Sequence, residues 1–79
     1  MEATEIYGKL GPIFHDIFDD PTIVVDAELS AKKVDGWDSL SHVRLMLTIE
    51  RAFGVHFSAS EIGGLKNVGE LVRLLQAKA

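Results

Sequence analysis

One serine stands where its hydroxyl could take part in chemistry. Ser39 lies between Asp38 and Leu40, three residues after the turn-forming Gly36. At the start of a helix its hydroxyl would be exposed, and a phosphate joined to it would meet free backbone amides and the positive end of the helix dipole. Asp38 could cap that helix or hold a cation beside a phosphodiester. On spacing alone, the simpler interpretation is that Asp38 caps the helix and Ser39 fills its first position.

The histidines offer weaker chemistry. His15, His42 and His56 are irregularly spaced and no cysteine accompanies them, so we expect no zinc or other metal site. His42 follows Ser39 by three residues, which would let the two side chains touch on a helix, as in a nucleophile–base pair. No oxyanion donor or third group accompanies the pair, so we expect no hydrolase activity and no catalysis by the chain itself.

The composition describes a small soluble domain. The chain has 79 residues, no cysteine, 47% hydrophobic residues and a net charge of −4. This excludes disulfide staples and a disordered composition, and the basic patch of a duplex nucleic-acid binder is missing. No apolar run reaches membrane-spanning length and no signal segment opens the chain. We expect one domain over residues 1–79, a cytoplasmic monomer with no nucleic-acid or membrane partner; Met1 and the compact termini favour a free protein.

Helical periodicity dominates the elements that must position Ser39. A first helix is expected from about Ala3 to Phe18, with a kink or a late start at Pro12 because proline lacks an amide donor. A long connection follows over residues 19–37. Within it, Trp37 is expected either to pack the connection against the helices or to shield the neighbourhood of Ser39.

The second half of the chain contains three further helix signals. One helix is expected over Ser39–Phe53, with Asp38 as its N-cap and Gly54 at its end. Ser58–Glu61 is a capping-box pattern that begins a helix of barely two turns, and Asn67 starts a last helix. The predicted fold class is therefore all-α: a small four-helix bundle with three longer helices, one short helix, and a long loop between the first two.

The second helix carries two apolar stripes, roughly 140° apart on a helical wheel. The first consists of Leu45, Met46, Ile49 and Phe53, and the second of Leu40, Val43 and Leu47. Such a helix is either buried on two sides or leaves one stripe exposed for docking. Arg44 and Arg51 lie beside the second stripe, and because guanidinium groups are poor neighbours for a dry core, they favour exposure.

Around Ser39 the sequence resembles the acyl carrier and peptidyl carrier proteins. Their signature is Gly-x-Asp-Ser-Leu, and here it reads Gly36-Trp37-Asp38-Ser39-Leu40 with about forty residues on either side. The resemblance continues through the second helix to the last one, and it covers essentially the whole chain. An intact signature argues against the alternative, a non-catalytic helical interaction module of the same fold that lacks a prosthetic arm.

The resemblance implies a cofactor and partners. Ser39 would take up 4′-phosphopantetheine from coenzyme A, with Asp38 and Leu40 beside the attachment point. A separate phosphopantetheinyl transferase would attach it with magnesium, and its thiol would carry an acyl or aminoacyl group as a thioester. This supplies the thiol that a chain without cysteine lacks. Acyl-loading and acyl-processing enzymes would be the further partners.

The resemblance also implies that the start of the second helix is the docking surface, formed here by Leu40, Val43, Arg44 and Leu47. Fatty-acid-synthase carriers usually have acids at the positions of Ser41 and Arg44. A partner with a basic patch would meet Arg44 as a like charge. We therefore predict a specialised carrier for an unusual fatty acid, a polyketide, or an aminoacyl or peptidyl unit, with His42 adjusting the docking face.

Overall fold

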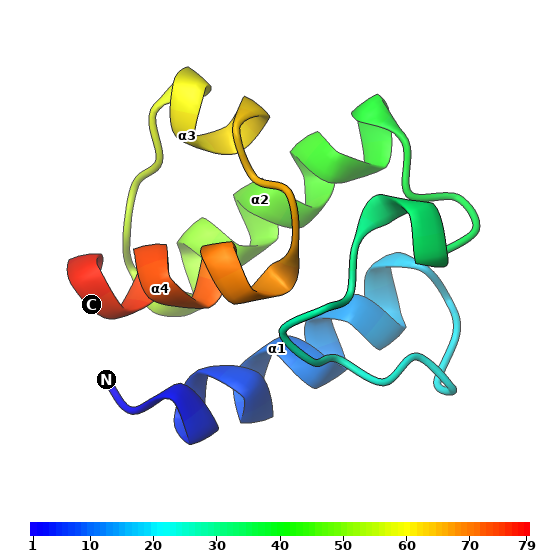
Figure 1. Ribbon diagram of the computed structural model, residues 1–79, viewed down its shortest axis with the longest axis horizontal. Helices are drawn as coiled ribbons and strands as arrows, with labels where there is room; N and C mark the ends of the chain where they lie inside the picture. Colours follow the sequence, from blue (N-terminus) through cyan, green and yellow to red (C-terminus); the bar gives the residue numbers. More distant parts are fainter.

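The computed structural model describes all 79 residues, and four helices form where periodicity and capping residues predict them (Figure 1). The all-α prediction is confirmed. The loop between the first two helices also contains a 3-10 helix, η1, which the sequence did not indicate. The elements are α1 (Ala3–Ile17), η1 (Ala31–Lys33), α2 (Ser39–Phe53), α3 (Ala59–Gly63) and α4 (Val68–Lys78).

Helix α1 begins at Ala3 as expected, so of the two alternatives at Pro12, a kink or a late start, the late start is wrong. The helix runs through this proline, and Phe18 is its C-cap rather than its last residue. Ile6, Leu10 and Phe14 form one stripe with no solvent exposure. Fully burying each such side chain stabilises the fold by about 1.5–3 kcal/mol, and a proline inside a helix costs about 3 kcal/mol. Burial of the stripe therefore outweighs the cost of the proline.

The long loop is packed against the start of α4. The amide of Val68 donates to the Leu29 carbonyl at 2.9 Å, and the amide of Gly69 donates to the Ala27 carbonyl at 3.0 Å. A Cβ on Gly69 would lie 3.1 Å from that Ala27 oxygen, so a larger residue would crowd this close approach. Leu29 and Val34 are buried, so the loop packs against the helices.

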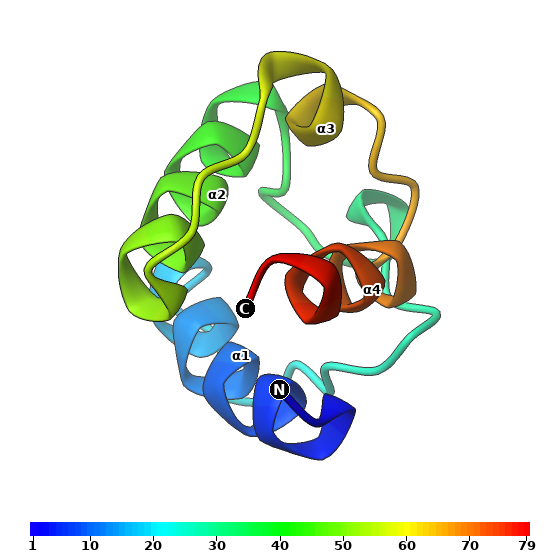
Figure 2. The same ribbon diagram turned by 90° about the vertical axis from the view of Figure 1, so that its left-hand side faces the viewer.

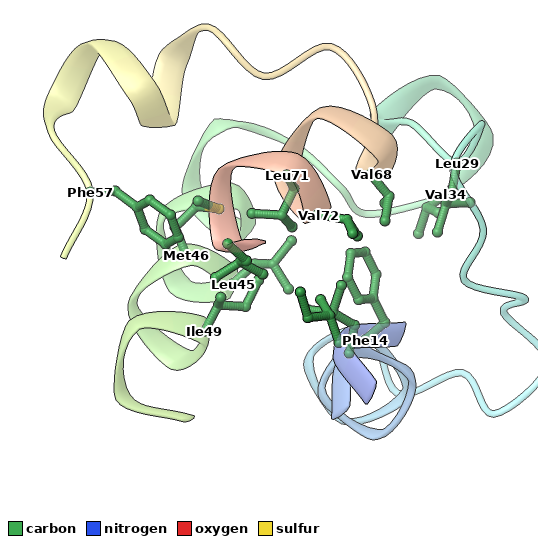
Figure 3. Close-up of a cluster of buried hydrophobic side chains, with 13 residues drawn as sticks. Phe14, Leu29, Val34, Leu45, Met46, Ile49, Phe57, Val68, Leu71 and Val72 are labelled. Carbon is green, nitrogen blue, oxygen red and sulfur yellow. The ribbon is translucent and has the colours of Figure 1, made fainter. Parts of the chain in front are cut away.

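The core lies between α1, α2 and α4 (Figure 2). Figure 3 shows Leu45, Met46 and Ile49 of α2 projecting into the same interior as residues of the other two helices. Helix α3 contributes no fully buried residue. Because every buried residue is hydrophobic, all polar chemistry lies at the surface; the core residues are Ile6, Leu10, Phe14, Leu29, Val34, Leu45, Met46, Ile49, Phe57, Val68, Leu71, Val72 and Leu75.

None of the four helices combines the length and the apolar character needed to span a membrane.

Candidate functional site

The N-terminus of α2 is built by a reciprocal capping box. The Ser41 amide donates to Asp38 Oδ1 at 2.9 Å, and the Asp38 amide donates to Ser41 Oγ at 2.8 Å. The Ser41 hydroxyl in turn donates to the Gly36 carbonyl at 2.6 Å, and Gly36 has a φ of 87°, which favours glycine. Two orphan amides are thus satisfied and the loop before Ser39 is held in place. The role of Ser41 was missed from the sequence, although Asp-x-x-Ser is a possible capping box.

Capping also determines the charge beside Ser39. The bond from the Ser41 amide, and then the contact with the Ser41 hydroxyl, lower the pKa of Asp38 below its usual value. The carboxylate is therefore ionised at neutral pH. It adds a negative charge at the positive end of the α2 dipole, where such a charge is stabilising.

Ser39 is the first residue of α2 and is exposed. Asp38 and Ser41 bond to each other, and the Ser39 hydroxyl forms no hydrogen bond within the protein. A free hydroxyl in this position can accept a covalent group without breaking a structural bond. Backbone amides in the first turn of a helix are also suited to a nearby phosphate. These residues therefore fit a phosphodiester-linked arm.

A cavity of about 720 Å³ begins beside this serine. Ten of its 16 lining residues are hydrophobic, so its wall suits an apolar chain better than a charged one. Its lining comes from the loop before α2, from α2 itself, from α3 and from the start of α4; among the lining residues are Trp37, Ser39, His42, Met46, Ile62 and Leu71.

His42 does not pair with Ser39. The indole Nε1–H of Trp37 donates to His42 Nδ1 at 3.0 Å, and His42 Nε2 lies 2.9 Å from the Ile62 carbonyl. The imidazole is half-buried and both its nitrogens are occupied, so the nucleophile–base pair is absent. Whether the ring adjusts the docking face stays a prediction.

Trp37 packs the loop against the helices, which is the first of the two alternatives that the sequence left open. Its ring meets Phe14 edge-on at 5.5 Å between centroids and lies 5.7 Å from Phe18. It also stacks on His42 at 6.0 Å. The tryptophan therefore connects α1, the loop and α2 immediately before the serine.

The second apolar stripe of α2 is exposed. Leu40, Val43 and Leu47 are 74%, 48% and 47% exposed, whereas the inner residues Leu45 and Met46 have no exposure. The alternative of a helix buried on two sides is therefore wrong. Whether the exposed stripe docks partners stays a prediction.

The charges beside that stripe are positive. Arg44 and Arg51 are exposed and neither forms an ion pair. The only acid within α2 is Glu50, whose Oε2 accepts from the Phe57 amide at 2.7 Å and lies 3.2 Å from His56 Nδ1. Its carboxylate is thus engaged with the segment after α2 and does not neutralise the arginines.

The three histidines lie at separate places. His15 Nε2 is 2.8 Å from the Ile23 carbonyl, His42 lies in the cavity wall, and His56 pairs with Glu50. No group of three or more histidine, aspartate or glutamate side chains is gathered in a way that could hold a metal ion.

Comparison with known proteins points to one family. The family model described as "Phosphopantetheine attachment site" matches residues 35–75, a segment that contains Ser39. Among solved structures, the chain is similar to the solution NMR structure of a holo acyl carrier protein from Geobacter metallireducens. The two are 43% identical, with a TM-score of 0.85, and the match covers 91% of this chain and 83% of that chain. A search of curated protein sequences gives no match.

Proposed function

This chain belongs to the acyl carrier family with a covalent 4′-phosphopantetheine, and from that premise we propose that Ser39 bears the arm. The observation that carries the proposal is the free, exposed Ser39 hydroxyl at the start of α2, inside the matched segment. The protein is a carrier and not an enzyme. When bound, the cofactor supplies a thiol, which a chain without cysteine does not have.

The residues around Ser39 prepare the attachment point. Asp38 and Ser41 hold the first turn of α2 in place, so the transferase meets a serine whose backbone is already ordered. The Asp38 carboxylate retains an oxygen, Oδ2, outside the capping box, which can face a cation brought by the transferase. Leu40, directly after the serine, offers an exposed apolar contact to the same enzyme.

The exposed stripe of α2 is the proposed docking surface, formed by Leu40, Val43, Arg44 and Leu47. Its three apolar side chains are solvent-exposed, although the other side of the same helix is fully buried. Contiguous apolar side chains rimmed by charge are typical of protein interaction sites. The partners are enzymes, such as a phosphopantetheinyl transferase and acyl-processing enzymes.

The charge of this surface supports a specialised pathway. Arg44 and Arg51 are exposed and unpaired, while Glu50 is engaged elsewhere. A partner with carboxylates around an apolar hollow would complement the surface, and a partner with a basic patch would be repelled. We place the chain in a dedicated pathway for an unusual fatty acid, a polyketide or an aminoacyl unit, as a single cytoplasmic domain over residues 1–79 that acts as a monomer.

One experiment tests the attachment site. The protein is incubated with coenzyme A, magnesium and a broad-specificity phosphopantetheinyl transferase, and its intact mass is measured. We expect one phosphopantetheine to be added to the unaltered chain and to Ser60→Ala, an exposed control on α3, and none to Ser39→Ala. Addition to Ser39→Ala would overturn the proposed site. No addition to the unaltered chain would leave the interaction module without an arm as the better interpretation.

A second experiment tests the pathway. If this protein supports chain elongation by a general fatty-acid synthase as well as that system's own carrier does, the specialised role is wrong. We expect poor elongation from the unaltered chain and improved elongation from Arg44→Glu, because the substitution removes the like-charge contact with a basic partner.

A further inference from the structure

The half-buried His42 is bonded on both sides of its ring within the cavity wall. Trp37 lies on one side, in the loop that leads to Ser39, and Ile62 lies on the other, in α3. All three residues line the same cavity. One side chain of α2 therefore joins two segments that are otherwise separate in the chain.

The tryptophan determines which nitrogen of His42 carries the proton. An indole N–H can only donate, so Nδ1, its partner at 3.0 Å, must be the unprotonated nitrogen. Nε2 then carries the proton and donates to the Ile62 carbonyl at 2.9 Å. Both bonds are satisfied at once only by the neutral ring in this tautomer.

The two segments differ in how firmly they are held without His42. Trp37 also packs on Phe14 and Phe18, so the loop has apolar anchors. Helix α3 has five residues and none is fully buried. Its ties to other elements include the 3.2 Å pair between Glu61 and Lys78 and the bond from His42 to Ile62. The carbonyls in the last turn of a helix have no hydrogen-bond donor within the helix, and His42 donates to one of them, the carbonyl of Ile62.

We propose that His42 is a positioning residue that holds α3 against α2 and keeps the cavity wall together between α3 and Trp37. Its effect on cargo rests on the proposed function: an acyl chain attached through Ser39 enters the cavity only as far as this wall allows. The side chain acts through its two neighbours and takes no part in any reaction.

Two substitutions separate the two bonds. Asparagine places an acceptor oxygen where histidine has Nδ1, so His42→Asn keeps the contact with Trp37 and loses the one with Ile62. Glutamine places an amide donor near the position of Nε2, so His42→Gln keeps the contact with Ile62 and loses the one with Trp37. Phenylalanine retains an aromatic ring and loses both bonds.

The first measurement uses the unmodified protein, so it does not depend on the arm. Hydrogen exchange reports on α3 through the amides of Ile62 and Gly64, and the indole N–H resonance reports on Trp37. We expect His42→Asn and His42→Phe to speed exchange of these amides by about two- to tenfold, the effect of one lost hydrogen bond, and His42→Gln to leave it unchanged. The indole resonance should move in His42→Gln and His42→Phe but not in His42→Asn. Unaltered α3 exchange in both His42→Asn and His42→Phe would overturn the proposal.

The second measurement uses the arm-bearing protein loaded with an octanoyl or an acetyl thioester. Hydroxylamine cleaves exposed thioesters, and its rate reports how well the cargo is sheltered. We expect His42→Asn to speed cleavage of the octanoyl thioester by about two- to tenfold and to leave the acetyl thioester unchanged. An equal rate for the octanoyl thioester in both proteins would overturn the effect on cargo. Failure to attach the arm would instead contradict the proposed function and leave the exchange result standing.

Discussion

The two stripes of α2 are made of the same kinds of side chain and lie in opposite environments. Leu45, Met46 and Ile49 have no exposure, because α1 and α4 cover them, whereas Leu40 is 74% exposed. A single 15-residue helix thus divides its two sides between folding and recognition. The difference teaches that hydrophobicity alone does not determine burial: the side flanked by arginines is the one left uncovered.

The stripes also differ in the charges around them. The inner stripe, Leu45, Met46 and Ile49, belongs to a core without polar groups, since no polar or charged residue is buried anywhere in the protein. The outer stripe is the exposed one, formed by Leu40, Val43 and Leu47. It lies beside Arg44 and Arg51, which form no ion pair. An arginine at the rim can keep its charge in water while its stem covers apolar surface. This arrangement suits a surface that is exposed at some times and covered by a partner at others.

Leu45→Ala should have the largest effect on stability. Truncating a fully buried leucine removes transfer free energy and leaves a cavity, so the free energy of unfolding should fall by about 2–5 kcal/mol. Urea denaturation followed by circular dichroism measures the loss. A fall in the free energy of unfolding as small as that of Leu40→Ala would contradict the distinction between the buried and the exposed stripe.

Leu47→Ala should mainly weaken docking. A central apolar residue of an interface costs about 1 kcal/mol or more when it is truncated, which is about fivefold in affinity. The measurement is the KM of phosphopantetheinyl transfer to the variant, with Arg73→Ala on α4 as an exposed control. An unchanged KM for Leu47→Ala, or an equal rise for Arg73→Ala, would remove the outer stripe from the docking surface.

The cap at the start of α2 should show a smaller effect that depends on pH. Because the pKa of Asp38 is lowered in the folded protein, its carboxylate contributes stability above the unfolded value of about 3.9 and loses it as the pH falls through the lower, folded value. Asp38→Asn keeps an acceptor for the Ser41 amide and removes the titration. Its melting temperature should therefore lie below that of the unaltered chain at about pH 6 and approach it at about pH 2.

The control for this prediction is Asp16→Asn, an exposed residue of α1 without a side-chain bond. The comparison is needed because the pKa of Asp20 and of Glu61 is also lowered, by bonds from Thr22 and Ser58 respectively, so the whole protein loses stability in acid. If the difference between Asp38→Asn and the unaltered chain is the same at both ends of the pH range, the ionised cap does not contribute as described.

Leu40→Ala should have the smallest effect on stability. A side chain that is 74% exposed loses little on truncation, so the free energy of unfolding should change by no more than about 0.5 kcal/mol. Urea denaturation of Leu40→Ala and Leu45→Ala under the same conditions compares the contributions of the two stripes to stability. A large loss would mean that Leu40 packs on the fold in solution.

Much of the fold could be predicted because its signals are local. The bounds of α2, its Asp38 cap, the Ser58 capping box and the start of α4 at Val68 all follow from side chains within a few residues of the bond they make. The late start of α1 was wrong because burial of its stripe, which is not local, outweighs the proline. The 3-10 helix η1 was missed because it has no apolar stripe of its own.

The site was predicted in part for the same reason. The exposed serine after a capping aspartate could be predicted from neighbouring residues alone, and the family signature agrees with this prediction. Ser41 was given no structural role, although its spacing from Asp38 was visible. The two bonds of His42 were missed because its partners, five residues before it and 20 residues after it, are brought together only by folding.

The sequence by itself determined the four helices, the N-caps of α2, α3 and α4, and a serine at the start of α2, because helical periodicity and capping depend on neighbours within one or two turns. It also determined that α2 has two apolar stripes, since the angle between residues is a property of the helix. The two arginines favoured exposure of the second stripe, but only the tertiary structure decided that it is uncovered, because that depends on where α1 and α4 pack. For the same reason, only the tertiary structure placed His42 between Trp37 and Ile62, in the wall of the cavity beside Ser39.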